Sequence, residues 1–351
     1  MCRNMRRYDY SFIKDMGIQT GIVTLMKRIA VFKVDVVERK KNEPEIFAAL
    51  ESIAKIQSIK GSNEIEGIVT TDKRIKEIVV ENSAPRNHDE EEIVGYRDVL
   101  NMIHNDYRKM KLDEESILKM HGDMMSHTEE KGGQYKEDDN VIINIDRQGN
   151  KSIRFRPVTS EETQRSMEQL ILAYIVARDD SNIDNTILIP CFILDFLCIH
   201  PFMDGNGRMS RLLSLLLMYK SGIDVGKYIS FEAEINKYKG SYYDALQRSS
   251  KGWHTNENDY LPFIEHFILT LFTCYKELDR RFEVVGDKKL NKGNRVEAAI
   301  LKNLGSISKK EIRELLPDVS ITTIEAKLTE LLKEGKIEKF GSYKDARYAR
   351  K

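Results

Sequence analysis

The stretch HPFMDGNGRMSR, at residues 200–211, joins two strongly apolar segments. The preceding segment, residues 187–199, reads ILIPCFILDFLCI, and residues 212–218, which follow the stretch, read LLSLLLM. Continuous apolar character of this kind is typical of helices that are buried on all sides. The polar stretch is therefore expected to be a loop between two core helices.

The glycines and arginines of this loop indicate phosphate binding. Gly205 and Gly207 can adopt backbone angles that are closed to other residues, which would let the amides around Asn206 turn inward as an anion site. The following helix adds the positive end of its dipole. Arg208 and Arg211 are three residues apart and so lie on one helical face. This arrangement suits a polyphosphate.

Asp204 and His200 add the groups that a transfer reaction needs. Asp204 is acidic in a site otherwise built for anions, which is explained if it holds Mg²⁺ that bridges phosphate oxygens. His200, with an ordinary pKa of about 6.5, can accept a proton near neutral pH. Together these groups indicate phosphoryl or nucleotidyl transfer. A plain helical corner with incidental polar residues is the alternative, but polar side chains between buried helices are costly.

The twelve residues resemble the signature of the Fic (filamentation induced by cAMP) family, HPFx[D/E]GNGRxxR, with every fixed position filled. The resemblance implies transfer of AMP from ATP to a hydroxyl side chain of a target protein, with release of pyrophosphate. It also implies a role for each position: His200 as the base, Asp204 as the Mg²⁺ ligand, Gly205, Asn206 and Gly207 as the phosphate cradle, Arg208 against the leaving pyrophosphate and Arg211 on the γ-phosphate.

An amphipathic helix is expected to begin at Pro44 and to end near SNEIEG, residues 62–67, with Gly67 as its cap. Spacing alone places Glu66 as an exposed residue before a capping glycine. SNEIEG, however, is similar to the Fic inhibitory motif [S/T]xxxE[G/N], which implies that Glu66 pairs with Arg211 and excludes the γ-phosphate. A second role, in which Glu66 orients a water that removes AMP, stays open.

A β-hairpin is expected from the alternating residues 141–145 and 151–156. It resembles the Fic flap, which docks the target segment, although it also reads as a simple connector. Lys136 stands where many Fic proteins have arginine. Tyr242 and Tyr243 match the family pattern IxxxKxxYYxxL, which implies that they line the nucleotide pocket, while their helical spacing equally suits core residues.

Other segments carry simpler predictions. The acidic run at residues 89–92 is expected to be the exposed first turn of a helix, where its charge complements the helix dipole. Asp113 is expected to cap the next helix, and His121 and His127 are interpreted as structural. Residues 1–40 show no clear periodicity and are left unassigned. A further helix is expected to begin with a capping box formed by Thr159 and Glu162.

The segment from residue 288 to residue 351 carries sixteen Lys and Arg against nine Asp and Glu. Helices are expected at 295–304, stopped by Gly305, at 308–316, with a Ser308–Glu311 capping box and Pro317 as terminator, and at 320–334, followed by a hairpin at 336–340 and 347–350. This order resembles a winged helix. The helix expected in a DNA groove mixes Glu with Lys, so DNA binding, protein recognition and dimer contacts are equally consistent with the pattern.

Composition excludes several classes of protein. The chain has 351 residues, 41% of them hydrophobic and 32% charged, and its formal net charge is zero, so it has no overall attraction to nucleic acid or membranes. No signal peptide or transmembrane run is evident. The four cysteines, Cys2, Cys191, Cys198 and Cys274, form no CxxC pair and are interpreted as reduced thiols of a cytoplasmic protein.

The sequence therefore predicts a mainly α-helical fold with three parts. These are an N-terminal helical region (1–110) with the inhibitory helix at 44–67, a Fic-type core with a hairpin flap (111–285) and a winged-helix module (288–351). The predicted activity is an ATP- and Mg²⁺-dependent protein adenylyltransferase restrained by Glu66. The alternatives are AMP removal, transfer of another phosphate-containing group, and a winged-helix transcriptional regulator with a nucleotide-sensing core.

Overall fold

The structure is a computed structural model that describes residues 6–145, 151–285, 292–301, 303, 306–316, 318–342 and 346–351. Cys2, the turn expected at 146–150, and the helix-ending residues Gly305 and Pro317 lie outside the described residues. Within the described part, no helix has both the length and the apolar character of a membrane span.

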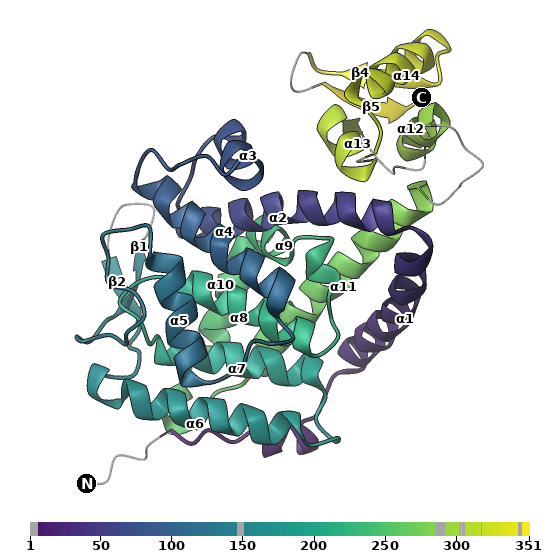
Figure 1. Cartoon of the computed structure of the whole chain (residues 1–351). Helices are drawn as coiled ribbons and strands as arrows, with labels where there is room; N and C mark the ends of the chain where they lie inside the picture. Colours follow the sequence, from purple (N-terminus) through teal and green to yellow (C-terminus); the bar gives the residue numbers. More distant parts are fainter. Residues whose placement is uncertain are drawn as a thin grey trace.

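Helices make up most of the described chain, as the sequence predicts (Figure 1). The helices of the larger part are α1 (Thr20–Asn42), α2 (Pro44–Glu66), α3 (Asp72–Val80), α4 (His88–Asp106), α5 (Glu114–Met125), α6 (Ser160–Arg178), α7 (Asn185–Ile199), α8 (Asn206–Lys220), α9 (Phe231–Lys237), α10 (Lys239–Ser250) and α11 (Leu261–Val285), with short 3-10 turns at Ser11–Asp15, Val225–Lys227 and Trp253–Thr255. The mainly α-helical fold with a small hairpin is confirmed.

Helices α7 and α8 lie at the centre of the molecule and pack against each other, as Figure 1 shows. Almost every side chain of α7 is buried, and so is almost every side chain of α8 up to Tyr219. Helices α2 and α4 cover α8 on one side, while α6 and α11 pack on α7. The polar loop at residues 200–205 therefore connects two core helices, which confirms the placement that the apolar flanks predict.

The N-terminal segment, left unassigned by its sequence, is anchored to a buried carboxylate. Asp195, in the middle of α7, accepts hydrogen bonds from Tyr10 at 2.8 Å and Trp253 at 2.6 Å and forms an ion pair with Arg6 at 3.1 Å. Helix α1 then packs along α11. A carboxylate without exposed surface requires such partners, and these come from positions far away in the chain, so local periodicity gives no sign of them.

Helix ends follow the sequence signals with two exceptions. Gly67 ends α2 in the left-handed conformation at φ 89°, and Asp113 caps α5, as predicted. The expected capping box at Thr159 is wrong, because its side chain makes no capping bond to the backbone of α6. The expectation of an exposed acidic turn on α4 is also wrong, since Glu90 and Glu92 are both buried.

These two carboxylates are buried because they have cationic partners in other helices. Glu90 accepts hydrogen bonds from Arg74 of α3 at 2.7 and 3.0 Å. Glu92 forms an ion pair with Arg208 of α8. Burial next to a guanidinium, rather than the helix dipole, explains why these positions are acidic.

The predicted hairpin is confirmed as strands β1 (Ile142–Ile145) and β2 (Lys151–Phe155), which pair antiparallel. Ile143 and Ile153 face each other across the two strands, and both side chains are largely exposed. Phe155 packs at the other end of the hairpin, near Trp253. The hairpin therefore offers apolar side chains to the solvent beside the central loop.

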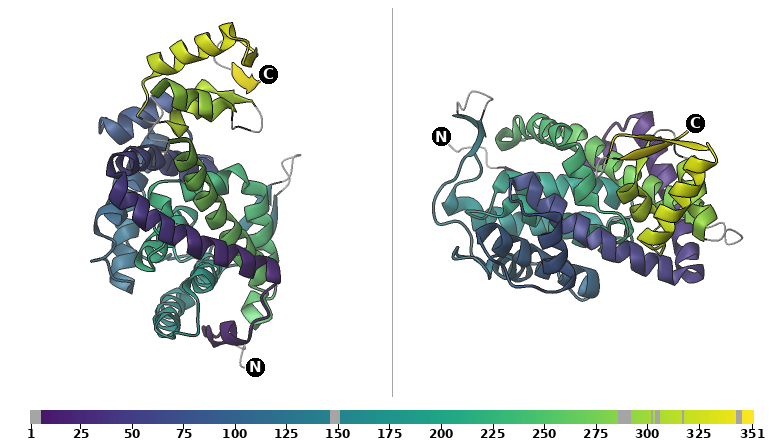
Figure 2. Two further views of the ribbon diagram at one scale, coloured as in Figure 1. Left: turned by 90° about the vertical axis from the view of Figure 1, so that its right-hand side faces the viewer. Right: turned by 90° about the horizontal axis from the view of Figure 1, so that it is seen from above.

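The C-terminal segment contains α12 (Lys292–Leu301), α13 (Lys309–Leu315), α14 (Ile321–Lys333) and strands β3 (Ile307–Ser308), β4 (Ile337–Phe340) and β5 (Arg347–Arg350), in the sheet order β3-β5-β4. The three helices, the hairpin and the capping box of Ser308 and Glu311 are confirmed, although α12 begins and ends three residues before its expected bounds, and β3 was not predicted. Figure 2 shows this segment at one end of the molecule, and its buried side chains form a separate apolar cluster.

Many basic side chains of this segment are already paired with its own acidic ones. The pairs are Arg295 with Asp318 at 2.8 Å, Lys309 with Glu325 at 2.9 Å, Lys327 with Glu297 at 3.1 Å, Lys336 with Glu297 at 2.9 Å and Arg347 with Glu311 at 2.9 Å. A cation that is held by a carboxylate contributes less to phosphate binding than a free one. These five basic side chains are thus less available to a nucleic acid.

Candidate active site

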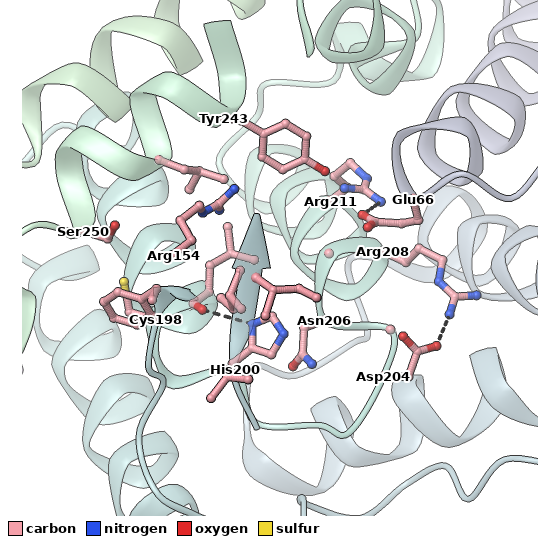
Figure 3. A pocket seen from close by; sticks show the side chains of 18 of the residues that line it. Glu66, Arg154, Cys198, His200, Asp204, Asn206, Arg208, Arg211, Tyr243 and Ser250 are labelled. Atoms are coloured by element: carbon pink, nitrogen blue, oxygen red, sulfur yellow. Dashed lines mark hydrogen bonds and ion pairs between the residues drawn. The ribbon is translucent and has the colours of Figure 1, made fainter. Parts of the chain in front are cut away.

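A cavity of about 750 Å³ lies beside the central loop, between the end of α2, the hairpin and α10 (Figure 3). All ten residues that the sequence predicts for the site line it: Glu66, His200, Asp204, Gly205, Asn206, Gly207, Arg208, Arg211, Tyr242 and Tyr243. Glu92 and Arg154, which the sequence did not predict for the site, line it too.

His200 ends α7 in the left-handed conformation at φ 52°, which turns the chain into the loop. Its Nδ1 lies 3.2 Å from the carbonyl oxygen of Leu197. Since that oxygen can only accept, the ring proton belongs on Nδ1, and Nε2 is left as an acceptor. Burial lowers the pKa of His200 to about 4, with the Leu197 carbonyl opposing that shift. The imidazole is therefore neutral at neutral pH.

Asn206 holds the loop closed. Its side chain accepts a hydrogen bond from the Phe202 amide at 3.0 Å and donates one to the Phe202 carbonyl at 2.8 Å. Gly205 takes φ 76°, and a Cβ there would lie 2.6 Å from Met124. The two hydrogen bonds engage the oxygen and one amide hydrogen of the Asn206 side chain in holding the loop, and its main-chain amide lies at the start of α8.

His121 supports the loop from beneath, in keeping with its interpretation as structural. Its ring stacks on Phe202 with centroids 3.7 Å apart. Its Nε2 lies 3.2 Å from the carbonyl oxygen of Asp204, and its Nδ1 accepts from the Gly133 amide at 3.1 Å. These contacts fix both ring nitrogens and leave none for a metal.

A second brace comes from the segment before the hairpin. The side-chain amine of Lys136 donates to the carbonyl of Ile199 at 3.0 Å. The main-chain amide of Lys136 donates to the carbonyl of Pro201 at 2.9 Å. Asn140 donates to the carbonyl of Phe202 at 3.0 Å. Burial lowers the pKa of Lys136 to about 8. The position that departs from the family pattern thus ties the hairpin base to the loop.

The N-terminus of α8 faces a carboxylate from α2. The first bond at this end of the helix runs from the Met209 amide to the Gly205 carbonyl at 2.8 Å, so the amides of Asn206 and Gly207 come before it. A Cβ on Gly207 would lie 2.2 Å from Oε1 of Glu66. The carboxylate therefore sits where these amides and the helix dipole would hold an anion.

Arg211 is held by the same end of α2. Its Nη2 donates to Oε1 of Glu66 at 2.7 Å and to the carbonyl of Ser62 at 3.0 Å, while Nε donates to the Ser62 hydroxyl at 2.8 Å. The side chain of Arg211 is 2% exposed and that of Glu66 is 33% exposed. The predicted contact between Glu66 and Arg211 is present.

Arg208 lies between two other carboxylates. Its Nη2 is 2.8 Å from Oδ2 of Asp204, and its Nη1 forms an ion pair with Glu92. The Arg208 side chain is 1% exposed, whereas that of Asp204 is 57% exposed. The link to Glu92 joins positions 116 residues apart, so only the folded chain reveals it.

Tyr242 and Tyr243 of α10 form the wall opposite the loop. Tyr242 is buried and Tyr243 partly buried, with ring centroids 5.4 Å apart. The guanidinium of Arg154, on β2, lies 5.2 Å from the Tyr243 ring centroid. This wall combines aromatic faces with a cation and can accommodate a flat, polarisable group.

The polar groups around the cavity suit a nucleotide bound together with a divalent cation. Helix-terminal amides and two arginines face one cavity, and Asp204 offers a largely exposed carboxylate beside them. Magnesium bound with a nucleotide usually takes one or two protein carboxylates together with phosphate oxygens. In the described part of the chain, no three His, Cys, Asp or Glu side chains converge as metal ligands.

Several solved structures are similar to this chain in fold. A Fic family protein from Desulfovibrio desulfuricans matches with 20% sequence identity and a TM-score of 0.61, over 96% of this chain and 97% of that one. A Fic domain containing signalling protein from Bacteroides thetaiotaomicron has 22% identity and a TM-score of 0.58, over 70% and 94%. A fragment of Fic-1 from C. elegans has 15% identity and a TM-score of 0.54, over 75% and 73%.

Sequence comparison agrees with this likeness. No curated protein matches the chain significantly. The model of the Fic/DOC family matches residues 111–218, which span the hairpin, α7, the loop and most of α8. That range excludes Glu66, Glu92 and the tyrosines of α10. Residues 111–218 therefore form a Fic/DOC family domain.

Proposed function

We propose that the chain is a protein adenylyltransferase that transfers AMP from ATP to a hydroxyl side chain of a target protein. A Fic domain supports a transferase in general. The finer assignment is supported by a neutral imidazole, two arginines, helix-terminal amides and an aromatic wall around one cavity. A target segment would lie along the hairpin, whose exposed Ile143 and Ile153 offer it apolar contacts.

In the proposed reaction, the acceptor hydroxyl oxygen attacks the α-phosphorus while its proton passes to Nε2 of His200. The bond from the α-phosphorus to the bridging oxygen breaks, and pyrophosphate leaves with the electron pair. Arg208 stabilises the charge that develops on the leaving group, and Arg211 binds the γ-phosphate. A divalent cation held by Asp204 would neutralise further phosphate charge.

We further propose that the chain is restrained by Glu66. The observation that carries this proposal is the position of the Glu66 carboxylate, which touches Gly207 at the N-terminus of α8 and binds Arg211 at 2.7 Å. A carboxylate at this place occupies the arginine and repels a triphosphate. ATP would have to displace it or bind in an unproductive pose.

The test is intact-mass analysis after incubation with ATP and Mg²⁺, on the parent chain, Glu66→Gly and Glu64→Gly. A charge-assisted hydrogen bond is worth about 1.5–3 kcal/mol. We therefore expect roughly 10- to 100-fold faster self-modification by one AMP in Glu66→Gly. Glu64→Gly places the same helix-weakening residue in the same turn, but its carboxylate binds Asn236 at 2.8 Å and lies outside the site.

The outcomes separate the remaining candidates. Equal modification of all three proteins would reject restraint by Glu66. A mass gain with another phosphate-containing donor, but not with ATP, would replace AMP as the transferred group. Faster loss of AMP from a modified target in the parent chain than in Glu66→Gly would assign Glu66 to AMP removal.

A further inference from the structure

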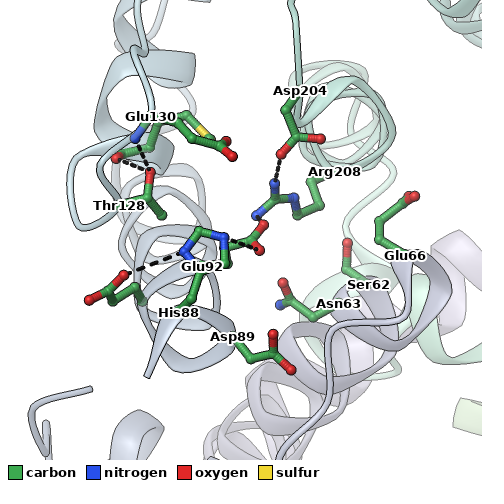
Figure 4. A network of polar contacts seen from close by, with 12 residues as sticks. Ser62, Asn63, Glu66, His88, Asp89, Glu92, Thr128, Glu130, Asp204 and Arg208 are labelled. Atoms are coloured by element: carbon green, nitrogen blue, oxygen red, sulfur yellow. Dashed lines mark hydrogen bonds and ion pairs between the residues drawn. The ribbon is translucent and has the colours of Figure 1, made fainter. Parts of the chain in front are cut away.

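Arg208 has two carboxylate partners, and the two differ in how firmly they are held (Figure 4). Asp204 stands on the loop with a side chain that is 57% exposed. Glu92 belongs to the first turns of α4, its side chain is 9% exposed, and α4 packs against α2, α5 and α8. Glu92 is therefore held next to Arg208 more firmly than Asp204 is.

The two partners use different nitrogens of the guanidinium. Nη1 of Arg208 pairs with Oε2 of Glu92, while Nη2 lies 2.8 Å from Oδ2 of Asp204. In the proposed function, Asp204 is the residue that would hold a divalent cation. With Asp204 engaged in this way, Nη2 would be free to donate to the leaving pyrophosphate, while Nη1 would keep its contact with Glu92.

Glu92 is in turn supported from the solvent side. Nε2 of His88, one helical turn earlier, lies 3.2 Å from Oε1 of Glu92, and Nδ1 of His88 lies 3.6 Å from Oε2 of Glu91. One oxygen of Glu92 thus faces His88 and the other faces Arg208. A neighbour at each carboxylate oxygen disfavours rotation of the group, and the buried Arg208 is the firmer of the two, since the His88 side chain is 54% exposed.

We propose that Glu92 is a positioning residue: it fixes one side of the Arg208 guanidinium, so that the other side points at the pyrophosphate that leaves. This inference rests on the proposed transferase function and deepens it. A flexible guanidinium would have to be ordered during the reaction, whereas a restrained one is ready to stabilise charge as it develops.

The charge and the geometry of Glu92 can be tested separately. Glu92→Gln keeps an oxygen of the same reach but removes one negative charge from beside the anion site. Glu92→Ala removes the charge and the restraint together. Both variants should bind pyrophosphate more tightly, because Glu92 no longer neutralises the charge of Arg208. Only Glu92→Ala should impair the chemical step, since only it frees Arg208.

The experiment uses the full chain with Glu66→Gly as the background. In that background, Glu92→Ala should lower kcat about tenfold without raising KM for ATP, and Glu92→Gln should restore most of kcat. The matched control is Glu91→Gln, which also loses a partner of His88 but has no contact with Arg208. It should leave both constants within about twofold. A rise in KM together with loss of thermal stability would make Glu92 merely structural and overturn the proposal.

Binding of Mg²⁺-pyrophosphate, measured by calorimetry, separates this inference from the proposed function. If the Glu66→Gly background transfers no group from any nucleotide, the proposed function fails, and the binding result decides on Glu92. Glu92→Gln should then tighten pyrophosphate binding several-fold, and this gain should vanish when Arg208→Ala is also present. A gain that persists without Arg208, or no gain at all, would refute the assignment.

Discussion

The two arginines at the start of α8 are held by glutamates that differ in their surroundings. Arg211 is bound by Glu66, at the last residue of α2, just before a glycine and with a partly exposed side chain. Arg208 is bound by Glu92, within a helix that is packed on three sides. A carboxylate at a helix end can be displaced at little cost to the fold, and a buried one cannot. The first contact suits regulation, and the second suits permanent alignment.

The largest expected effect concerns the base, His200. The two glutamates act on the arginines that bind the nucleotide, so removal of the imidazole should leave both glutamate–arginine pairs intact. His200→Ala, in the Glu66→Gly background, should slow AMP transfer by roughly 10²- to 10⁴-fold. Nucleotide affinity, measured by calorimetry, should stay within about twofold.

His127→Ala is the matched control, since His127 bonds Asp98 away from the cavity and should change neither quantity. Transfer at an undiminished rate by His200→Ala would remove the base assignment. Loss of nucleotide binding would mean that the imidazole takes part in holding the donor.

The pH dependence gives the next largest effect. At pH 5.5, a histidine with an ordinary pKa near 6.5 would be neutral in about one molecule in ten. Burial lowers the pKa of His200 to about 4, so its neutral, proton-accepting form should persist to far lower pH. The rate of Glu66→Gly should therefore be nearly flat from pH 8 to about pH 5.5 and fall only near pH 4.

This profile is obtained from kcat/KM, which reports ionisations of the free enzyme. An acid limb centred near pH 6.5 would show that the imidazole is exposed to water when it reacts. A flat profile would show that protonation of His200 does not affect the comparison of Glu66 with Glu92 in this pH range.

The smallest expected effect tests how the end of α2 holds Arg211. The Ser62 hydroxyl accepts a hydrogen bond from Nε of Arg211 at 2.8 Å, and so helps α2 to hold the arginine. Losing one such bond costs about 0.5–1.5 kcal/mol. Ser62→Ala in the parent chain should therefore raise self-modification roughly 2- to 10-fold, as measured by intact mass.

Ser58→Ala is the control for this variant. Ser58 lies one turn earlier in α2, is equally buried, and bonds the Ser230 hydroxyl at 2.9 Å instead of the site. It should leave the rate unchanged. A slower reaction in Ser62→Ala would mean that Ser62 aligns Arg211 for ATP rather than retaining it.

Much of the site was predictable because its signals are local. The loop carries its glycines, arginines, acid and histidine within twelve positions, and apolar flanks place it in the core. The end of α2 is likewise predictable, because Gly67 follows it and a serine lies four residues before the glutamate. Such patterns depend on helical spacing and on turn geometry, which sequence records directly.

What the sequence did not reveal depends on distant pairing. Glu92 belongs to a run of acids that reads as a solvated first turn, and only Arg208 explains its burial. The sequence around Arg6 gives no sign of its partner, because Asp195, with which it pairs in the fold, lies far away in the chain. An ion pair between remote positions leaves no periodic trace, so tertiary contacts overrule the local interpretation.

The brace formed by Lys136 and Asn140 has a mechanical consequence. Both residues bind carbonyl groups of the turn that carries the imidazole, and both lie a few positions ahead of strand β1. Hairpin base and turn are therefore one connected unit. A polypeptide bound along the hairpin would therefore pull on the carbonyls of Ile199, Pro201 and Phe202, on both sides of His200, so that binding of the target and the position of the base would be coupled.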